Sequence, residues 1–542
     1  MSLKSFEMNQ YARFFIKIVI LTFGFFLLLL GCTSKKKDFN IIYISLDTTR
    51  FDYIDTGKGA RAYTPELQEY SKRSIVFENA FSTSTQTLPS HLSVFTSHYP
   101  HELGVYSNDD QYKGGFKFIS QVFEEKGYTT AAIISLGTLN SSTGTQKGFQ
   151  EFHEDLFDDR IFFVPAEKIT SEAIETLHKL QKGRFFLFVH YSDPHTPYAP
   201  PEAKGGFSIS LDGNPIMRFD SYRGAILKER IPFSKGSHVL DFETDHDMED
   251  FSHFVIRGLV ASEECSLVTE DLVYSEKLYG GSYKMKSSAA QIKIHCKKEG
   301  FIEIFQIIPI LKSESAREYY RLETVYMDSS VGKLLRSIDE MGLQDKTIVA
   351  IFADHGEGHG EREGFFGHTR YLNRQFIHVP LIINIPGWGR KRIGYPVSLV
   401  GLSPTILEFL DIRDQSFDYR ESFLEALQGG VYEHKLICSF AFDPTAKAHK
   451  FSIIQWPFQC IVCTAQGNVE KREFYNLALS QSFSDKDAIH EETVLGASLS
   501  HVHSFQRKFK EMREIVHGAE RPHTSLDKKE LEKLKALGYI DN

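Results

Sequence analysis

The chain has 542 residues, of which 42% are hydrophobic, and its formal net charge is -9 at pH 7. This length and hydrophobic content permit a large buried core and two or three domains. The mildly acidic balance, without a sustained basic patch, argues against a nucleic-acid partner.

The first 40 residues indicate export and a lipid anchor. Basic residues precede an apolar stretch, residues 18–30, that is short for a membrane span and typical of a signal-peptide core. The stretch runs into Leu-Leu-Gly-Cys at Cys32, which resembles a bacterial lipobox. That resemblance implies a signal peptide over residues 1–31, lipidation of Cys32 and a polar tether over residues 32–40. An uncleaved membrane anchor is the alternative. Either way, the rest of the chain is expected outside the cytoplasm, as a membrane-anchored bacterial lipoprotein.

Three apolar runs, residues 40–46, 185–189 and 347–352, have the composition of strands buried in a parallel sheet. Each run leads into residues that can bind a divalent metal, which are Asp47, then His190, Asp193 and His195, and finally Asp354 and His355. Acids after strands often only start turns or cap helices. However, α/β enzymes assemble ligand sites at the carboxyl ends of such strands. The three runs together therefore predict a metal site.

A possible nucleophile lies between the first two runs, in the segment Thr87-Leu88-Pro89-Ser90-His91. Pro89 suits the first turn of a helix that continues over residues 92–96. A hydroxyl at this point would face free backbone N–H groups and the positive end of the helix dipole, where phosphate or sulfate is stabilised. Thr87 is therefore the nucleophile candidate. The alternative is that Thr87 only caps the helix.

Residues 202–312 differ from the segments on either side. Gly-rich breaks separate short extended runs, a pattern that predicts a β-rich insertion. The insertion could gate the site, bind a polymer or only brace the core. Cys265 and Cys296 could form a disulfide within it if the protein is exported.

The segments around the insertion complete one α/β core. Helical and strand patterns after the insertion predict that residues 41–201 and 313–412 form two parts of a doubly wound sheet. Residues 413–542 are predicted to form a smaller C-terminal α+β subdomain.

Six motifs follow one another in order along the two core segments: Ser45-Leu46-Asp47-Thr48-Thr49-Arg50, Thr64-Pro65-Glu66-Leu67, Thr87 to His91 running on to Ser97-His98-Tyr99-Pro100, Asp193-Pro194-His195-Thr196-Pro197-Tyr198, Asp354-His355-Gly356-Glu357 and His378-Val379-Pro380-Leu381. Together they resemble the sulfatase branch of the alkaline phosphatase superfamily. The resemblance implies a mainly parallel, doubly wound sheet of that type and a metal-dependent ester hydrolase or transferase.

The resemblance also implies roles for individual residues. It assigns metal binding to Asp47, Thr87, Asp354 and His355. It assigns substrate binding to Arg50, His91 and Asp193, and catalysis to Thr87, His195 and His368. An imidazole ligand favours Mn²⁺ or Zn²⁺ over Ca²⁺. A second metal held by Asp193, His195 and His368 is the alternative to a single ion.

The chain departs from sulfatases at three places. Those enzymes use a formylglycine made from Cys, or sometimes Ser, within C/S-x-P-x-R, where this chain has Thr87 and His91. Thr cannot supply that aldehyde. The family's Lys-x-His is absent from the stretch that here ends Ile133-Ile134-Ser135, and His355 replaces an Asn of calcium-dependent sulfatases.

A threonine nucleophile with an Asp-His pair resembles the phosphodiesterases and the phosphoglycerol or phosphoethanolamine transferases of the superfamily. We therefore expect chemistry on phosphate, or else sulfate, esters through a phosphothreonine. The substrate is expected to be a small molecule or a membrane or cell-wall ester. A true sulfatase and an inactive surface-binding lipoprotein are the alternatives, and the sequence does not indicate an oligomeric state.

Overall fold

The computed structural model describes residues 38–478 and 488–489, apart from gaps at 157–162, 202, 204–205, 220–225, 246–249, 276–281, 286, 431, 433–434, 444–447 and 466–467. Apart from Asp38, these residues belong to one compact unit, Phe39–Asn542. The predicted signal peptide, Cys32 and most of the tether lie outside the described residues. Within them, no helix combines the length and hydropathy needed to cross a bilayer.

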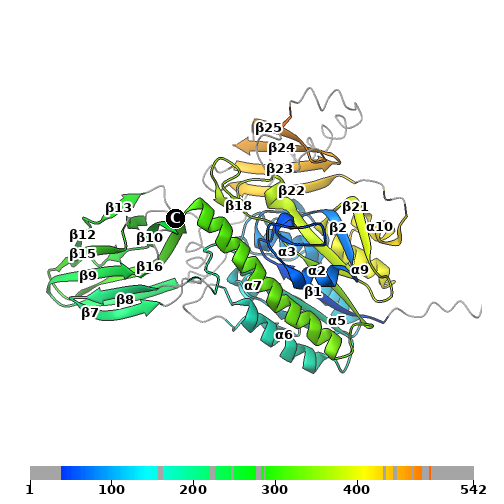
Figure 1. Cartoon of the computed structure of the whole chain (residues 1–542), viewed down its shortest axis with the longest axis horizontal. Coiled ribbons are helices and arrows are strands. Elements are labelled where there is room, and N and C mark those ends of the chain that lie inside the picture. Colours follow the sequence, from blue (N-terminus) through cyan, green and yellow to red (C-terminus); the bar gives the residue numbers. More distant parts are fainter. Residues whose placement is uncertain are drawn as a thin grey trace, which may run out of the picture. The chain divides into compact units, whose positions relative to one another are not determined.

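An eight-stranded sheet forms the core, in the order β21-β2-β20-β17-β1-β5-β3-β4 (Figure 1). Its strands are β1 (Asn40–Leu46), β2 (Ile75–Phe81), β3 (Thr129–Ile133), β4 (Glu151–His153), β5 (Phe185–Tyr191), β17 (Thr347–Phe352), β20 (His378–Asn384) and β21 (Lys391–Ser398). Neighbouring strands are parallel except that β20 runs antiparallel to both β17 and β2. The predicted α/β sheet with mainly parallel strands is confirmed.

The three predicted strands are the adjacent strands β17, β1 and β5, and every residue in them is buried. Burial on both faces explains their continuous apolar sequence. One boundary differs from the prediction: β5 continues through His190 and Tyr191, two residues beyond the predicted end. His190 therefore lies inside a strand rather than in the loop after it.

Helices pack along this sheet. They are α2 (Pro65–Ser71), α3 (Thr87–Thr96), α4 (Pro100–Leu103), α5 (Ile119–Glu125), α6 (Ala166–Leu180), α7 (Ser313–Glu340), α8 (Arg374–Ile377), α9 (Leu402–Phe409) and α10 (Leu424–Gln428). The long helix α7 lies against α6 and α2. It buries an apolar stripe that includes Val331, Leu334 and Ile338, as helical spacing predicts.

The segment between β5 and α7 forms two antiparallel sheets. One has the order β12-β15-β9-β6-β7, and the other has β11-β16-β10-β14-β13 with β8 paired to β16. The strands are β6 (Phe207–Leu211), β7 (Asn214–Phe219), β8 (Ile226–Phe233), β9 (Gly236–Thr244), β10 (Phe251–Arg257), β11 (Val260–Ala261), β12 (Cys265–Val268), β13 (Leu272–Ser275), β14 (Ser282–Met285), β15 (Ala289–Cys296) and β16 (Gly300–Leu311).

These two sheets share one hydrophobic core. Strand β15 shows why: its residues alternate between exposed and buried, so that Ile292 and Ile294 point inward. A disulfide joins Cys265 to Cys296, which face each other on β12 and β15. The domain boundaries predicted for this insertion stay predictions.

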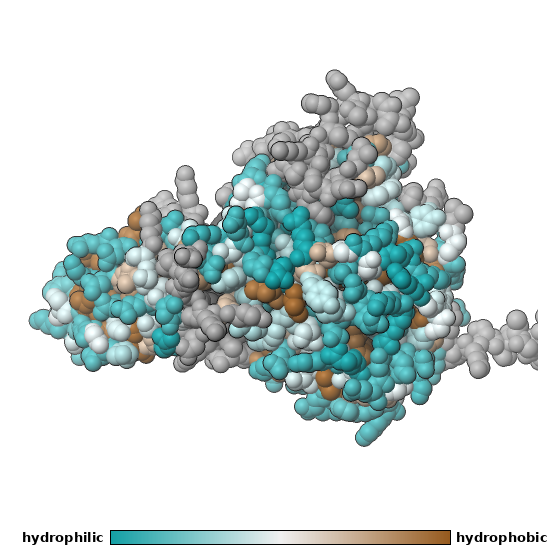
Figure 2. Space-filling view, in the orientation of Figure 1, coloured by the Kyte–Doolittle hydropathy of each residue, from teal (hydrophilic) through white to brown (hydrophobic). Residues whose placement is uncertain are grey.

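A further antiparallel sheet follows the core, made of β22 (Ile437–Asp443), β23 (Ala448–Gln455), β24 (Phe458–Ala465), β25 (Asn468–Asn476) and β26 (Ala488–Ile489). Its first strand is tied to the chain just before α3, because the Phe440 N–H donates to the carbonyl oxygen of Thr83 (2.8 Å) and Ser439 Oγ to that of Ser82 (2.6 Å). On the face drawn in Figure 2, hydrophilic residues predominate and hydrophobic ones form small separate groups, as is usual for a face exposed to water.

Candidate active site

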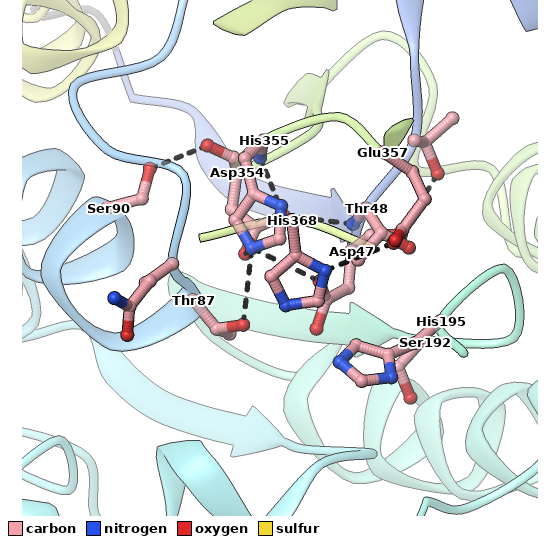
Figure 3. Close-up of polar contacts among 12 residues, drawn as sticks. Asp47, Thr48, Thr87, Ser90, Ser192, His195, Asp354, His355, Glu357 and His368 are labelled. Atoms are coloured by element: carbon pink, nitrogen blue, oxygen red, sulfur yellow. Dashed lines mark hydrogen bonds and ion pairs between the residues drawn. The ribbon is translucent and has the colours of Figure 1, made fainter. Parts of the chain in front are cut away.

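The carboxyl ends of β1 and β17 bring three potential metal ligands together. Asp47 directly follows β1, which ends at Leu46. Asp354 and His355 lie just after β17, which ends at Phe352. Donor atoms of all three lie within 4.8 Å of one another, and all three side chains are buried (Figure 3). Parallel pairing of β1 with β17 places the two strand ends side by side, which is why residues some 300 positions apart in the sequence meet.

This group of donors fits a divalent metal. Neither carboxylate oxygen of Asp47, nor Oδ2 of Asp354, has a hydrogen-bond partner among the described residues. The Nε2 atom of His355 lies 3.4 Å from Asp354 Oδ2 and 3.9 Å from Asp47 Oδ1. Burial raises the pKa of Asp47 to about 7 and the pKa of Asp354 well above its ordinary value. Buried carboxylates this close together are costly unless a cation compensates them.

The other oxygen of Asp354 is fixed by the backbone. Asp354 Oδ1 accepts hydrogen bonds from the N–H of His355 (2.8 Å) and of Thr48 (3.2 Å). Thr48 has a φ of 54°, in the left-handed region. The Tyr320 hydroxyl of α7 supports this conformation, because it donates to the Thr48 carbonyl oxygen (2.8 Å) and accepts from the Arg50 N–H (3.0 Å). The turn after β1 thus fixes the orientation of the Asp354 carboxylate.

Thr87 is the first residue of α3, and Gln86 occupies the capping position. The Thr87 hydroxyl lies 3.4 Å from His355 Nε2 (Figure 3). Ser90, on the first turn of the same helix, donates to the Asp354 carbonyl oxygen (2.7 Å), which holds α3 against the turn after β17. Gln86 rather than Thr87 therefore occupies the capping position of α3, and the role of Thr87 as nucleophile stays a prediction.

His91 uses both ring nitrogens within the protein. Nδ1 lies 2.8 Å from the Thr87 carbonyl oxygen, and Nε2 lies 2.8 Å from Ser45 Oγ on β1. Since a carbonyl oxygen only accepts, Nδ1 carries the proton and Nε2 accepts from the serine. These contacts tie His91 to Thr87 and to β1, and its predicted contact with substrate stays a prediction.

Arg50 is also engaged by protein groups. Its guanidinium is fully buried and pairs with Asp52 (Nε to Oδ1, 2.8 Å) and Glu361 (Nη1 to Oε1, 2.6 Å). It also donates to the Glu357 carbonyl oxygen (3.2 Å). Two carboxylates therefore balance the charge that the sequence predicted for binding substrate.

The two histidines predicted to be catalytic lie beside the metal-binding group. The ring of His368 lies 4.5 Å from that of His355 and 5.0 Å from that of His195, centroid to centroid. His368 Nδ1 lies 3.1 Å from Glu357 Oε2. Burial opposes protonation of His368, but the carboxylates of Glu357, Asp47 and Asp354 together outweigh burial and raise the histidine's pKa. The pair has the arrangement of a proton donor and its orienting acid.

Asp193 contacts the N-terminus of helix α6. Its Oδ1 accepts the N–H of Ala166 at the start of α6 (3.0 Å), so this carboxylate helps to cap a helix. His195 Nδ1 lies 2.6 Å from the Thr196 carbonyl oxygen. Within the described part of the chain, Asp193, His195 and His368 do not form a second group as compact as that of Asp47, Asp354 and His355.

Sequence reasoning counted His190 only among the residues after the second apolar run that could bind a divalent metal, and the structure shows that it contacts the site directly. Its Nε2 lies 3.4 Å from Asp47 Oδ2, and its Nδ1 lies 3.1 Å from Ser135 Oγ. Ser135 in turn donates to Ser192 Oγ (2.7 Å). Burial lowers the pKa of His190 to about 3, so the imidazole is neutral. In the sequence, the signal for His190 was its place at the end of an apolar run, shortly before Asp193.

Asn108 was missed entirely. The Leu88 N–H donates to its Oδ1 (2.8 Å), and the Asn108 N–H donates to Gln86 Oε1 (2.9 Å), so it is bonded to the residues on both sides of Thr87. The side chain is fully buried, and among the described residues its Nδ2 has no hydrogen-bond partner. A single Asn in a loop carries no sequence signal of such a position.

The chain matches the family model "Sulfatase" over residues 39–412. It is 24% identical over 410 residues to the N-acetylglucosamine-6-O-sulfatase of Bacteroides thetaiotaomicron, which covers 71% of this chain and 70% of that protein. It is 22% identical over 362 residues to human iduronate 2-sulfatase, covering 60% of this chain and 56% of that protein.

Solved structures show the same fold. A structure in complex with its substrate D-glucosamine-2-N,6-O-disulfate superposes with a TM-score of 0.59 at 16% identity, over 90% of this chain and 100% of that one. The phosphonate monoester hydrolase of Agrobacterium radiobacter superposes with a TM-score of 0.56 at 13% identity, over 89% and 96%. The chain therefore belongs to the sulfatase family of ester hydrolases and has its alkaline phosphatase-like fold.

Proposed function

We propose that this sulfatase-family protein hydrolyses phosphate esters, with Thr87 as the nucleophile and one divalent metal as cofactor. The observation that carries the proposal is the position of the Thr87 hydroxyl, at the start of α3 and 3.4 Å from His355 Nε2, beside the buried carboxylates of Asp47 and Asp354. A threonine there cannot become the formylglycine of sulfatases. The fold shared with a phosphonate monoester hydrolase is compatible with phosphorus chemistry.

Each part of the site has a task in this reaction. Asp47, Thr87, Asp354 and His355 would hold the metal, which supplies charge stabilisation for the substrate oxygens and makes a hydroxyl easier to ionise. His91 fixes the backbone of Thr87, so that the hydroxyl attacks along one direction. The Thr87 hydroxyl gives up its proton to solvent as its oxygen bonds to phosphorus, and the bond to the ester oxygen breaks. His368, oriented by Glu357, donates the proton to the leaving alcohol. Water then attacks the phosphorus of the phosphothreonine, returning one proton to His368, and the Thr87 oxygen leaves and regains its proton from solvent.

Sulfate ester hydrolysis is the second candidate, because the curated relatives named above are sulfatases. Sulfate and phosphate esters are both tetrahedral anions, and the fold serves both. The difference lies in the nucleophile, since the aldehyde-derived group of sulfatases cannot form at Thr87.

Two isosteric or near-isosteric variants test the nucleophile. Thr87→Val keeps the shape of the side chain and removes the hydroxyl, whereas Thr87→Ser keeps the hydroxyl. Turnover of aryl phosphate monoesters, aryl phosphate diesters and aryl sulfates is measured with Mn²⁺, Zn²⁺ or Ca²⁺. We expect metal-dependent phosphoester turnover that falls by at least about 10³-fold in the Val variant and survives in the Ser variant. Efficient turnover of the sulfate ester alone, or unchanged turnover by the Val variant, would refute the proposal.

We also propose that the protein is a lipoprotein held on a membrane outside the cytoplasm through Cys32, with a membrane, cell-wall or small-molecule ester as substrate. The Cys265–Cys296 disulfide supports an oxidising compartment. Metabolic labelling with a fatty acid should mark the wild type and leave Cys32→Ala unlabelled and larger by the uncleaved signal peptide. Equal labelling of both proteins would exclude lipidation at Cys32.

A further inference from the structure

The C-terminal sheet reaches the segment that carries Thr87. Its first strand, β22, pairs in parallel with the chain before α3 through Phe440 and Ser84, and the Phe440 N–H donates to the Thr83 carbonyl oxygen (2.8 Å). Paired strands lie about 4.8 Å apart and advance about 3.3 Å per residue. Three residues beyond Ser84 the chain reaches Thr87, and three residues beyond Phe440 it reaches Asp443, the last residue of β22. The pairing thus leads Asp443 toward the start of α3.

The loop that carries His368 approaches Asp443 as well. The His368 ring lies 4.5 Å from that of His355, centroid to centroid, and Arg370 follows two residues later. Two residues of chain span at most about 7 Å, so the backbone of Arg370 stays close to that of His368. Arg370 Nε lies 3.8 Å from Asp443 Oδ1. Asp443 is therefore linked both to the segment of the nucleophile and to the loop of the proton donor.

Strand β23 adds a second cation at this place. Lys450 Nζ lies 3.5 Å from Asp443 Oδ2, so a lysine and an arginine approach the two oxygens of one carboxylate. Lys450 lies over the Tyr371 ring, 4.6 Å from its centroid. Arg370 lies over the Phe365 ring, 5.4 Å from its centroid. Aromatic faces hold cations in this way, and the two basic side chains with Asp443 are called the cation group below.

The two cations of this group are partly open to solvent. The side chain of Arg370 is 36% exposed and that of Lys450 is 14% exposed, whereas the Arg50 side chain in the turn after β1 is fully buried. Their distances to Asp443 are also long for ion pairs, since Arg50 and Glu361 approach to 2.6 Å. A guanidinium presents its N–H donors in a planar fork that matches a carboxylate or phosphate. An anion that arrives from solvent can therefore reach this group.

We propose that Arg370 and Lys450 bind an anionic group on the leaving alcohol of the substrate and thereby determine specificity. The proposal rests on the proposed function, in which His368 donates a proton to that alcohol, because Arg370 follows His368 by two residues. The anionic group is a carboxylate, or a further phosphate or sulfate, a few bonds from the ester oxygen. Asp443 holds the two cations in place and offsets part of their charge.

Two aryl phosphates of the same shape test the proposal on the full-length, metal-loaded protein. 3-Carboxyphenyl phosphate carries a carboxylate on its leaving alcohol at neutral pH, and 3-carbamoylphenyl phosphate carries an uncharged amide there. The para isomers place the same groups farther from the ester oxygen. If the protein prefers diesters, the methyl diesters of the same phenols form the pairs. We expect kcat/KM to favour the carboxylate by about tenfold in at least one pair.

Variants show whether the cation group causes this preference. Arg370→Met and Lys450→Met should each reduce the preference by about threefold or more, because each removes one positive charge. Asp443→Asn keeps the shape of its side chain and removes a negative charge, so it should raise the preference by a similar factor. Arg230→Met is the matched control, because Arg230 is an exposed arginine of the insertion that pairs with Glu303 (2.5 Å). It should keep the wild-type preference.

The outcomes separate this proposal from the proposed function. No preference for the carboxylate in either pair, or a preference that Arg370→Met, Lys450→Met and Asp443→Asn leave unchanged, would overturn the proposal and leave Thr87-dependent hydrolysis intact. A group that only ties the loop to the C-terminal sheet would lower the unfolding midpoint in all three variants without changing the preference. Turnover of neither these monoesters nor the diesters would overturn the proposed function, and the proposal with it.

Inhibition of the wild type by the product phenols provides a measurement that needs no variant. 3-Hydroxybenzoate and 3-hydroxybenzamide have the same shape and differ in one charge. We expect the benzoate to inhibit at a concentration about tenfold lower than the benzamide, and to lose this advantage as salt screens the partly exposed cations. Equal inhibition by the two phenols, or stronger inhibition by the benzamide, would contradict an anion-binding role for the cation group even if its variants failed to fold.

Discussion

Replacing Asn108 by Asp would change one buried NH₂ group into an oxygen and leave the size of the side chain unchanged. The Asn108 side-chain oxygen accepts the Leu88 N–H at 2.8 Å, one residue after Thr87, and the NH₂ group has no hydrogen-bond partner among the described residues. A donor held beside the nucleophile at a helix N-terminus is suited to bind a substrate oxygen. We therefore expect Asn108 to stabilise the negative charge of the transition state.

The size of the effect follows from the geometry. Loss of one preorganised donor to a developing oxyanion costs about 10²- to 10³-fold in kcat. Some stability should also be lost, because the second Asp oxygen is buried without a partner, although the first still accepts the Leu88 N–H and a negative charge near a helix N-terminus contributes about 0.3–1 kcal/mol. Asn108→Ala differs in leaving the Leu88 N–H buried and unbonded, at a cost of about 1–3 kcal/mol.

Steady-state kinetics with the best phosphoester and thermal unfolding of the two variants form the assay. The expected pattern is a low kcat for the Asp variant at temperatures well below its unfolding midpoint, and a midpoint below that of wild type for the Ala variant. If the Asp variant kept kcat within about threefold of wild type, the NH₂ group would not be an oxyanion donor. If both variants lost stability while kcat stayed within about threefold of wild type below their midpoints, Asn108 would have only a structural role.

Three other changes have defined outcomes. Asp354→Asn should lower metal affinity by at least about 100-fold, measured as metal content after dialysis. Without metal, the variant should unfold at a temperature no lower than the wild type, because one of two adjacent buried carboxylates is gone. Replacing Cys265 and Cys296 by Ser opens a 31-residue connection and should reduce stability by about 3–4 kcal/mol, seen as a lower unfolding midpoint without loss of kcat. Tyr320→Phe leaves the Thr48 carbonyl and the Arg50 N–H without their buried partner. We therefore expect the free energy of unfolding to fall by about 1–3 kcal/mol and metal binding to weaken. Wild-type metal affinity in this variant would show that Tyr320 does not position the turn after β1.

Several site residues could be predicted because their chemistry is rare in its local context. A carboxylate directly after a fully apolar run, as at Asp47 or Asp354, is expensive to bury without a purpose. The sequence therefore indicated where the site lies. The structure brings Asp47, Asp354, His355 and Thr87 together there. Their roles as ligands and nucleophile stay predictions until they are tested by mutation.

Other residues could not be read from the sequence, since their roles depend on partners far along the chain. Arg50 has the composition of an anion-binding group, but Glu361 neutralises it from a loop more than 300 residues later. His190 looked like one of several polar residues at a strand end, and it reaches Asp47 only because β5 extends by two residues and lies beside β1. Asn108 is an ordinary loop residue until the fold places it at the start of α3.

The sequence by itself determined the elements and the chemistry available to them. Apolar runs that are buried on both faces have few alternatives to central strands, and the ordered motifs indicated the sulfatase family and candidate residues for a metal site. The tertiary structure alone decided which charges compensate one another and which remain for a substrate. Charge compensation depends on distance and burial, and these are set by the packing of β1, β5, β17 and α3 rather than by any local stretch of sequence.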